Sequence, residues 1–408
     1  MNCKERIRSQ IGRRFGNGIL VAIWLLGVCT PVFGQETREG QLAAEQAAKA
    51  KQLHPYEPST TERVLIRVNR ALNETPNGFY PYIDSVYSGG GFALGPGYRR
   101  YYGDRTLWDL RGLLSIKGYK LIELSTESPG HARGRLDVYA RTGWRDATQV
   151  AFYGIGNDSS HDGRTNFRMK QGYATGGLRA RPLRWAVFNG ALSYEDFTTA
   201  SGSGATPSID EVHTPQSAPG LGAHPAYLHT TASAGIDWRP SPGYARRGGL
   251  FEVRYHNYAD RDDAHSFDRV DAEIVQHVPI LRENWVLSLR GQVQTTLDDN
   301  DAVPYFLLPS LGSGSTLRGY NSWRFRDRHS LLVSAEWRWI PNRLGFDMAL
   351  FYDAGKVTSR RTDLDFGGLK NDVGIGARFH GLAATLLRVE LAHSREGMRL
   401  VFAAGPSF

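Results

Sequence analysis

Apolar and polar side chains alternate along most of the chain beyond about residue 83. In one such segment Leu331, Val333 and Ala335 alternate with Ser334 and Glu336. Successive side chains of a strand point to opposite faces, so a period of two predicts β-strands with one apolar and one polar face. Charges at every second position are costly in lipid but compatible with a water-filled interior. The pattern therefore predicts a transmembrane β-barrel with apolar residues outside.

Fifteen segments show this alternation, and one of them is long enough for two strands. They are 83–94, 106–126, 133–145, 147–154, 165–182, 184–196, 227–239, 246–258, 265–278, 283–296, 330–340, 345–357, 370–380, 384–394 and 397–408. We divide 106–126 at Lys117-Gly118, which gives sixteen strands, and bacterial single-chain barrels have an even number. The predicted fold class is all-β, a 16-stranded antiparallel transmembrane barrel over residues 82–408. A soluble β-sandwich is the alternative with the same period.

Two connections are longer than ordinary hairpin turns. They run from Thr198 to Ala226 and from Leu297 to His329, and we expect both on the extracellular side. The first is rich in Gly, Ser, Pro and Ala. Its exposure would also suit an adhesive or structural surface protein, which is one alternative for the function.

The amino terminus has the features of an export signal. Basic residues from Lys4 to Arg14 precede the apolar run Ile19 to Val32, so we predict a signal peptide over residues 1–34. Residues 35–81 are predicted to form a short periplasmic helical segment, with helices over Glu39 to Leu53 and after the capping pair Ser59 and Glu62. This segment could plug the barrel, bind a periplasmic partner or act as a simple tether.

Composition excludes several classes of function. The formal net charge is +8, and the signal contributes five bases and one acid, so the remainder carries +4 and does not suit a nucleic-acid partner. Both cysteines, Cys3 and Cys29, lie in the predicted signal. The twelve histidines are scattered, and His256 and His277 are expected in the lumen. We predict no enzymatic activity, no catalytic or metal-binding residues and no cofactor.

An ordered set of motifs lies in the last third of the chain. It consists of Pro309-Ser310-Leu311-Gly312, Leu317-Arg318-Gly319-Tyr320, Phe351-Tyr352-Asp353-Ala354-Gly355, Val373 to Phe379 and Arg399 to Phe408. This set resembles the bacterial surface-antigen barrel of the BamA and TamA superfamily of outer-membrane assembly factors. The resemblance is strongest over residues 300–408. The polypeptide-transport-associated domains of that superfamily do not fit into the 47 residues from Gln35 to Pro81, so we expect them to be lacking.

The resemblance implies that the second long loop folds into the lumen. There Arg318 would meet Asp353 on the wall. In the predicted strand order, the loop follows the eleventh strand and Asp353 lies on the thirteenth. We call Arg318, Gly319, Tyr320 and Asp353 the latch. A guanidinium and a carboxylate can pair through two hydrogen bonds, and glycine permits a tight turn beside them. Glu336 and Arg338 are the expected lumen neighbours; a solvated Arg318 and an ordinary lumen acid are the alternative.

The two ends of the predicted barrel form a second site of interest. Gly89, Gly90 and Gly91 fall in the predicted first strand, and Gly405-Pro406 near the end of the last. Few side chains and a proline without an N–H donor predict a weak lateral seam, with ordinary bending and fraying as the alternative. Phe402 and Phe408 are an even number of residues from Leu400, so in the predicted last strand all three side chains point outward. We interpret the two phenylalanines as a C-terminal insertion signal.

The resemblance implies a bacterial outer-membrane protein that assists insertion or translocation of protein, or of lipid. The alternative is a passive channel or porin with a loop constriction. Expected partners are outer-membrane lipid, the cell's barrel-assembly machinery, and unfolded outer-membrane proteins or a periplasmic partner.

Overall fold

The computed structural model describes residues 45–49 and 77–408, except 104, 282, 299–301, 342–344 and 382–383. The chain divides into two units, residues 1–63 and 64–408. In the first unit residues 45–49 are helical, in agreement with the helix predicted over Glu39 to Leu53. The predicted signal peptide and the helix after Ser59 lie outside the described residues.

The second unit is dominated by one antiparallel sheet of sixteen strands, in the order β1 to β11 followed by β14 to β18. Its strands are β1 Gly78–Asp84, β2 Ala93–Tyr102, β3 Thr106–Ser115, β4 Lys120–Gly130, β5 Leu136–Phe152, β6 Thr165–Ala180, β7 Ala186–Ser201, β8 Ala226–Asp237, β9 Gly248–Asp260, β10 Phe267–Ile280, β11 Trp285–Thr296, β14 His329–Trp339, β15 Phe346–Thr358, β16 Lys370–His380, β17 Thr385–Ser394 and β18 Gly397–Ala403. The short strands β12 Ser310–Leu311 and β13 Phe325–Arg326 pair separately. The helical turns are α3 His131–Gly134, α4 Ile209–Val212, η1 Pro242–Tyr244 and η2 Arg361–Asp363.

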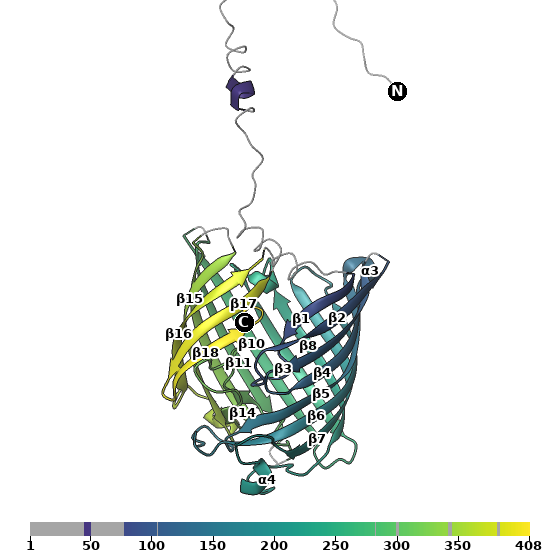
Figure 1. Ribbon diagram of the computed structural model, residues 1–408, viewed down its shortest axis with the longest axis vertical. Coiled ribbons are helices and arrows are strands. Elements are labelled where there is room, and N and C mark those ends of the chain that lie inside the picture. The colour runs from purple at the N-terminus through teal and green to yellow at the C-terminus, as the bar shows by residue number, and fades with distance from the viewer. Residues whose placement is uncertain are drawn as a thin grey trace, which may run out of the picture. The chain divides into compact units, whose positions relative to one another are not determined.

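The sheet curls into a cylinder (Figure 1), and many large apolar side chains lie on its outer face. Ile122, Leu350 and Ile375 are each more than half exposed on that face, whereas charged residues such as Asp109 are buried on the inner face. A soluble sandwich would bury its large apolar side chains between two sheets. The single sheet with exposed apolar residues confirms the barrel class and is inconsistent with the sandwich. No helix among the described residues is long and apolar enough to cross a membrane.

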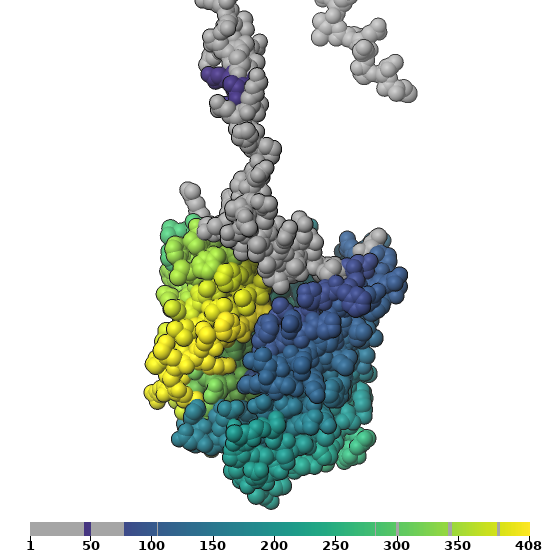
Figure 2. Space-filling view, viewed as in Figure 1, coloured from purple at the N-terminus to yellow at the C-terminus, as the bar shows by residue number. Residues whose placement is uncertain are grey.

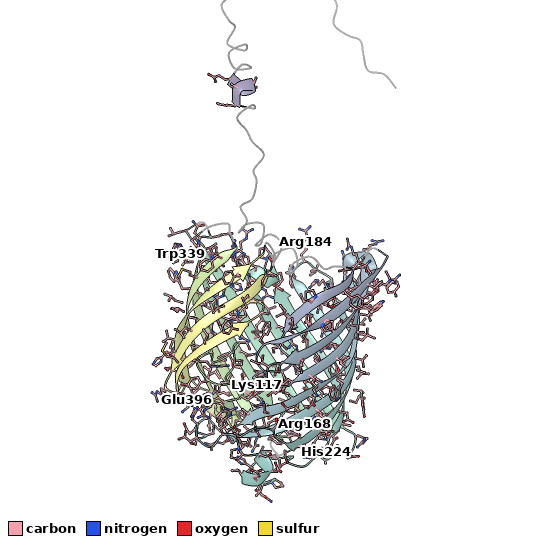
Figure 3. The ribbon with its side chains drawn as sticks, viewed as in Figure 1. Lys117, Arg168, Arg184, His224, Trp339 and Glu396 are labelled. Atoms are coloured by element: carbon pink, nitrogen blue, oxygen red, sulfur yellow. The ribbon has the colours of Figure 1, made fainter. Side chains whose placement is uncertain are left out.

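The two ends of the cylinder differ in their connections. Long loops join the strands at one end, where Arg168 and His224 lie, and shorter connections lie at the other, with Arg184 and Trp339 (Figure 3). We call these the loop end and the turn end.

The strand count was predicted correctly through two errors that cancel. Segments 133–145 and 147–154 form the single strand β5, because a bulge between Ala147 and Val150 shifts the register. Inward positions are odd before the bulge and even after it, which made one strand resemble two. Conversely, 83–94 covers the end of β1, a turn and the start of β2.

The glycines assigned to the first strand lie in that turn instead. Gly89 and Gly91 have positive φ values of 86° and 74°, which suit a turn and not a strand. The prediction that Gly89, Gly90 and Gly91 belong to the first strand was therefore wrong. The actual first strand contains Pro81. Proline is tolerated there because β1 pairs only with β2 and leaves its other edge free of ladder hydrogen bonds.

β1 and β18 are the two edge strands of the sheet. Their regions meet on the outer surface in Figure 2, where the blue amino-terminal strands border the yellow carboxy-terminal ones. Each of the two pairs with a single neighbour in the described part of the chain. The cylinder thus has a seam that ladder hydrogen bonds do not close.

Candidate functional site

The connection between β11 and β14 folds back into the cylinder. β12 and β13 form a small hairpin within it, with Ser310 opposite Arg326. Leu317 and Tyr320 of this loop pack with Leu332 of β14 and Val357 of β15 in a buried apolar cluster. The loop is therefore anchored on the inner wall by burial of its own apolar side chains.

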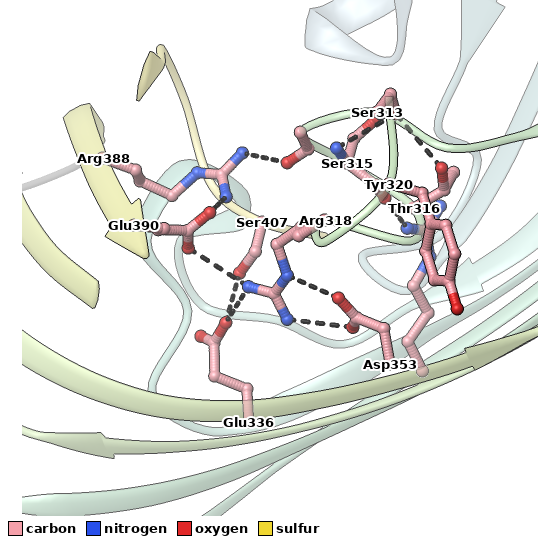
Figure 4. A network of polar contacts seen from close by, with 12 residues as sticks. Ser313, Ser315, Thr316, Arg318, Tyr320, Glu336, Asp353, Arg388, Glu390 and Ser407 are labelled. Atoms are coloured by element: carbon pink, nitrogen blue, oxygen red, sulfur yellow. Dashed lines mark hydrogen bonds and ion pairs between the residues drawn. The ribbon is translucent and has the colours of Figure 1, made fainter. Parts of the chain in front are cut away.

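Arg318 lies at the centre of a buried group of acids (Figure 4). Its Nε and Nη2 donate to Asp353 Oδ2 at 2.7 Å and Oδ1 at 2.9 Å. Its Nη1 donates to Glu336 Oε2 and Glu390 Oε1, both at 3.1 Å. The guanidinium also lies 3.5 Å from the ring centroid of Phe351. The structure thus brings Arg318 and Asp353 together through two hydrogen bonds.

Burial and the nearby negative charges shift the pKa of Arg318 in opposite directions. Burial alone favours the neutral form, but the nearby carboxylates, Asp353 above all, hold the pKa of Arg318 above its ordinary value. Only 2 % of the Arg318 side chain and 1 % of Asp353 are exposed. An ion pair this well removed from water depends on the complete set of hydrogen bonds around it.

Three further arginines balance the acids. Arg378 Nη2 donates to Glu336 and, at 3.0 Å, to Glu390. Arg388 Nη1 donates to Glu390 Oε2 at 2.8 Å, and Arg338 Nε lies 3.9 Å from Glu336 Oε1. Of the predicted neighbours, Glu336 therefore contacts the latch directly and Arg338 contacts Glu336.

Gly319 and Tyr320 are held by close contacts of different kinds. A Cβ on Gly319 would lie 2.6 Å from Asp372 Cβ and 3.0 Å from Ser394 Cβ, so the wall leaves room only for glycine. The Tyr320 hydroxyl donates to the carbonyl of Asn371 at 3.2 Å. The backbone on both sides is fixed by Arg399, whose Nη1 donates to the carbonyls of Arg318 and Tyr320.

The C-terminal tail, Ala404 to Phe408, follows β18 and does not continue it. The carbonyl of Gly405, a residue with φ of 77°, accepts a hydrogen bond from Arg388 Nε at 3.0 Å. Ser407 Oγ donates to Glu336 Oε2 at 2.9 Å. The chain end therefore joins the charged group that holds Arg318.

Phe402 and Phe408 have different surroundings. Phe402 is 64 % exposed on the outer face, as its parity predicted. Phe408 is stacked with His277 at 6.4 Å and lies beneath the Arg290 guanidinium at 5.9 Å, both from the inner wall. The prediction of an outward Phe408 was wrong, because the strand ends at Ala403 and side-chain parity ends with it. Gly405-Pro406 was predicted near the end of the last strand, but it lies beyond that strand because β18 ends at Ala403.

Glu390, Arg378 and Arg388 were missed as members of the site. Alternation correctly predicts that Arg388 and Glu390 face inward. It does not predict which inward side chains meet, because that depends on strand register, such as the pairing of Glu390 with Gly376. Sequence spacing alone carries no signal for this.

Aromatic side chains pack in the lumen between the latch and the loop end. Tyr305 and Phe306 of the β11–β14 connection pack with Phe152, Phe167 and Phe197 of the wall. Arg326 is buried beside them and donates to the carbonyls of Tyr305 at 3.0 Å and Ala151 at 3.1 Å. Burial lowers the pKa of Arg326 to about 10, which still leaves it charged at neutral pH.

A second polar chain lies on the inner wall of β7 to β10. His229 Nδ1 is 2.8 Å from Glu195 Oε1, and His229 Nε2 is 3.0 Å from His256 Nδ1. His256 Nε2 is in turn 3.3 Å from Asp271 Oδ2. His256 thus lies in the lumen as predicted, as does His277. Within the described residues, no group of three or more His, Cys, Asp or Glu is arranged to hold a metal ion.

No protein-family model and no curated protein matches the sequence. Among solved structures, the chain is similar to BamA from Haemophilus ducreyi lacking POTRA domains 1–3, with a TM-score of 0.56 at 14 % identity over 87 % of this chain and 80 % of that one. It is also similar to CdiB from Escherichia coli, with a TM-score of 0.53 at 12 % identity over 81 % of this chain. The alignment spans 59 % of CdiB. At these identities the similarity shows a shared fold, and at that level it confirms the resemblance predicted from the motifs.

Proposed function

We propose that this chain is a bacterial outer-membrane barrel that assists insertion or translocation of polypeptide, or of lipid, at that membrane. The observation that carries the proposal is the loop arginine, Arg318, buried in the lumen against Asp353, Glu336 and Glu390. A loop held in this way keeps the lumen occupied, so the resting protein is a plugged barrel and not an open pore. The similarity to the barrels of BamA and CdiB supports the same class of function.

The remaining parts of the chain fit this role. We assign residues 1–34 to an export signal, 35–81 to a short periplasmic segment, and the rest to the barrel. The turn end would then face the periplasm and the loop end the outside. Partners would be outer-membrane lipid, the barrel-assembly machinery during biogenesis, and unfolded outer-membrane proteins or a periplasmic protein during function.

The seam between β1 and β18 supports handling of a client chain. A short last strand of seven residues and an in-folded tail leave both edges with unpaired backbone groups. Exposed edges can pair with an added strand. Gly405 and Pro406 contribute by turning the tail away from β1.

Conductance in planar bilayers tests the proposal. The intact protein should give small, erratic currents, and Arg318→Ala should enlarge them because the loop loses its charged anchor. Arg254→Ala is the matched control: it removes another inner-wall arginine, paired with Glu252 at 2.7 Å and 41 % exposed, without touching the loop.

Large, steady and selective openings of the intact protein would instead indicate a passive channel. Copurification followed by mass spectrometry tests the handling of clients. Recovery of unfolded outer-membrane proteins by the intact chain would support the proposal, and their absence from an otherwise folded preparation would contradict it.

A further inference from the structure

Five exposed arginines and two exposed apolar side chains lie on neighbouring connections at the turn end of the barrel. They come from three connections: β2–β3, β4–β5 and β6–β7. We call this group the rim patch; it comprises Arg105, Arg133, Arg135, Arg181, Arg184, Leu183 and Trp185.

The three connections are neighbours in space. Arg105 Nη1 lies 3.6 Å from the position that a Cβ on Gly130 would occupy, which joins the first connection to the second. The backbone N–H of Arg181 donates to the carbonyl of Arg135 at 2.7 Å, which joins the second to the third. The three connections therefore bring their five exposed arginines to one stretch of the turn end. Figure 3 shows Arg184 at this end.

The positive charge of the rim patch is largely uncompensated. Arg181 Nη1 lies 3.6 Å from Asp137 Oδ2. In the part of the chain that the structure describes, Arg133, Arg135 and Arg184 have no ion pair. Inside the barrel, by contrast, Arg318, Arg378 and Arg388 all contact carboxylates. A single exposed arginine would be an ordinary solvated charge, but a cluster of unpaired ones attracts anions.

The turn that presents Arg133 has a disfavoured backbone. Ala132 and Arg133 have φ values of 50° and 63°, in the left-handed region that residues with a Cβ rarely adopt. Asp137 Oδ1 accepts a hydrogen bond from the Gly130 N–H at 2.9 Å and holds this turn to β5. Unfavourable conformations of this kind are concentrated at functional positions.

The apolar members of the patch set its depth relative to a membrane. Leu183 is 51 % and Trp185 48 % exposed, and Leu178 on the outer face of β6 is 50 % exposed. Tryptophan is enriched where the hydrocarbon region meets the headgroups. The guanidinium groups of the same turn are then level with lipid phosphates.

We infer that the rim patch binds the phosphate groups of anionic phospholipids in the leaflet at the turn end. A guanidinium can hold a phosphate through two parallel hydrogen bonds, and basic clusters at a membrane surface favour anionic over zwitterionic lipid. The inference rests on the proposed outer-membrane barrel and adds a lipid site to it.

Native mass spectrometry of the full chain in detergent tests the inference, with phosphatidylglycerol and phosphatidylcholine as probes. The triple variant Arg133→Gln, Arg135→Gln, Arg184→Gln should bind phosphatidylglycerol at least about tenfold more weakly, while its binding of phosphatidylcholine stays unchanged. Arg181 is kept because it contacts Asp137.

The matched control removes three exposed arginines from the loop end, by Arg261→Gln, Arg360→Gln and Arg395→Gln. It should bind phosphatidylglycerol as the unchanged protein does. Equal loss in both triple variants, or no loss in the rim variant, would overturn the inference. Complete displacement of the lipid by inorganic phosphate would also overturn it, because the site would then be one for free phosphate.

Heat-modifiable migration on gels reports barrel folding independently. A folded rim variant with normal lipid binding refutes the lipid site alone. An unchanged chain that never folds in detergent or lipid would refute the proposed function instead.

Discussion

Replacement of Arg318 by methionine removes a charge and four hydrogen bonds from the centre of the latch while keeping much of the side-chain volume. Glu336 and Glu390 retain Arg378, and Glu390 also retains Arg388. Asp353 loses both hydrogen bonds that Arg318 donates. The main consequence of the substitution is therefore a buried Asp353 carboxylate that has lost its cationic partner.

The structure sets the expected size of the effect. Removing one partner of a buried pair costs about 3–5 kcal/mol, and the 2 % and 1 % exposed fractions of Arg318 and Asp353 leave little room for solvent to reduce it. Asp353→Asn should cost about 1.5–3 kcal/mol, because Arg318 still contacts Glu336 and Glu390. Once Arg318 is gone, Asp353→Asn removes the stranded charge. The double variant should therefore be more stable than additivity predicts by about 1.5–3 kcal/mol.

Urea unfolding of the barrel in lipid vesicles, followed by tryptophan fluorescence, measures these differences. Arg360→Met is the control, because Arg360 is 77 % exposed in its pair with Asp363 and should change stability by less than about 0.5 kcal/mol. A coupling energy between Arg318 and Asp353 below about 0.5 kcal/mol would show that the pair does not act as a unit. The burial argument would then fail.

Three further outcomes are expected. Gly319→Ala should destabilise the barrel by about 1–3 kcal/mol in the same urea assay, because its Cβ would meet Asp372, whereas Gly112→Ala, with open space around it, should have no effect beyond about 0.5 kcal/mol. A nitroxide attached after Phe402→Cys should be relaxed by oxygen dissolved in lipid, and one attached after Phe408→Cys should be shielded; equal relaxation would contradict the in-folded tail. Arg326→Ala should loosen the aromatic packing around Tyr305 and raise the bilayer conductance, and unchanged currents would show that this packing does not restrict the lumen.

Alternation predicted the barrel because lipid and water impose opposite polarities on the two faces of every strand. It failed where the period was interrupted. The bulge after Ala147 divided β5 in the prediction, and the turn at Gly89 was absorbed into a strand because its apolar flanks continue the pattern. The positions where strands begin and end depend on backbone geometry, and the alternation of side chains does not reveal that geometry.

Within the site, the motif resemblance identified Arg318 and Asp353, and periodicity placed Glu336 on the inner wall. Neither could place Ser407 or Phe408 in the lumen, because the tail leaves the sheet and follows no strand. Glu390 was visible as an inward acid, but its contact with Arg318 spans 72 residues of sequence and depends on the curvature of the whole wall.

The shared use of one glutamate oxygen by Arg318 and Ser407 has a practical consequence for experiments. An affinity tag fused after Phe408 would have to leave from inside the cylinder, past Arg290 and His277, and would disturb the residues that anchor the loop. Reporter sequences belong instead in an exposed stretch of the 202–225 connection, where added length does not touch the charged centre.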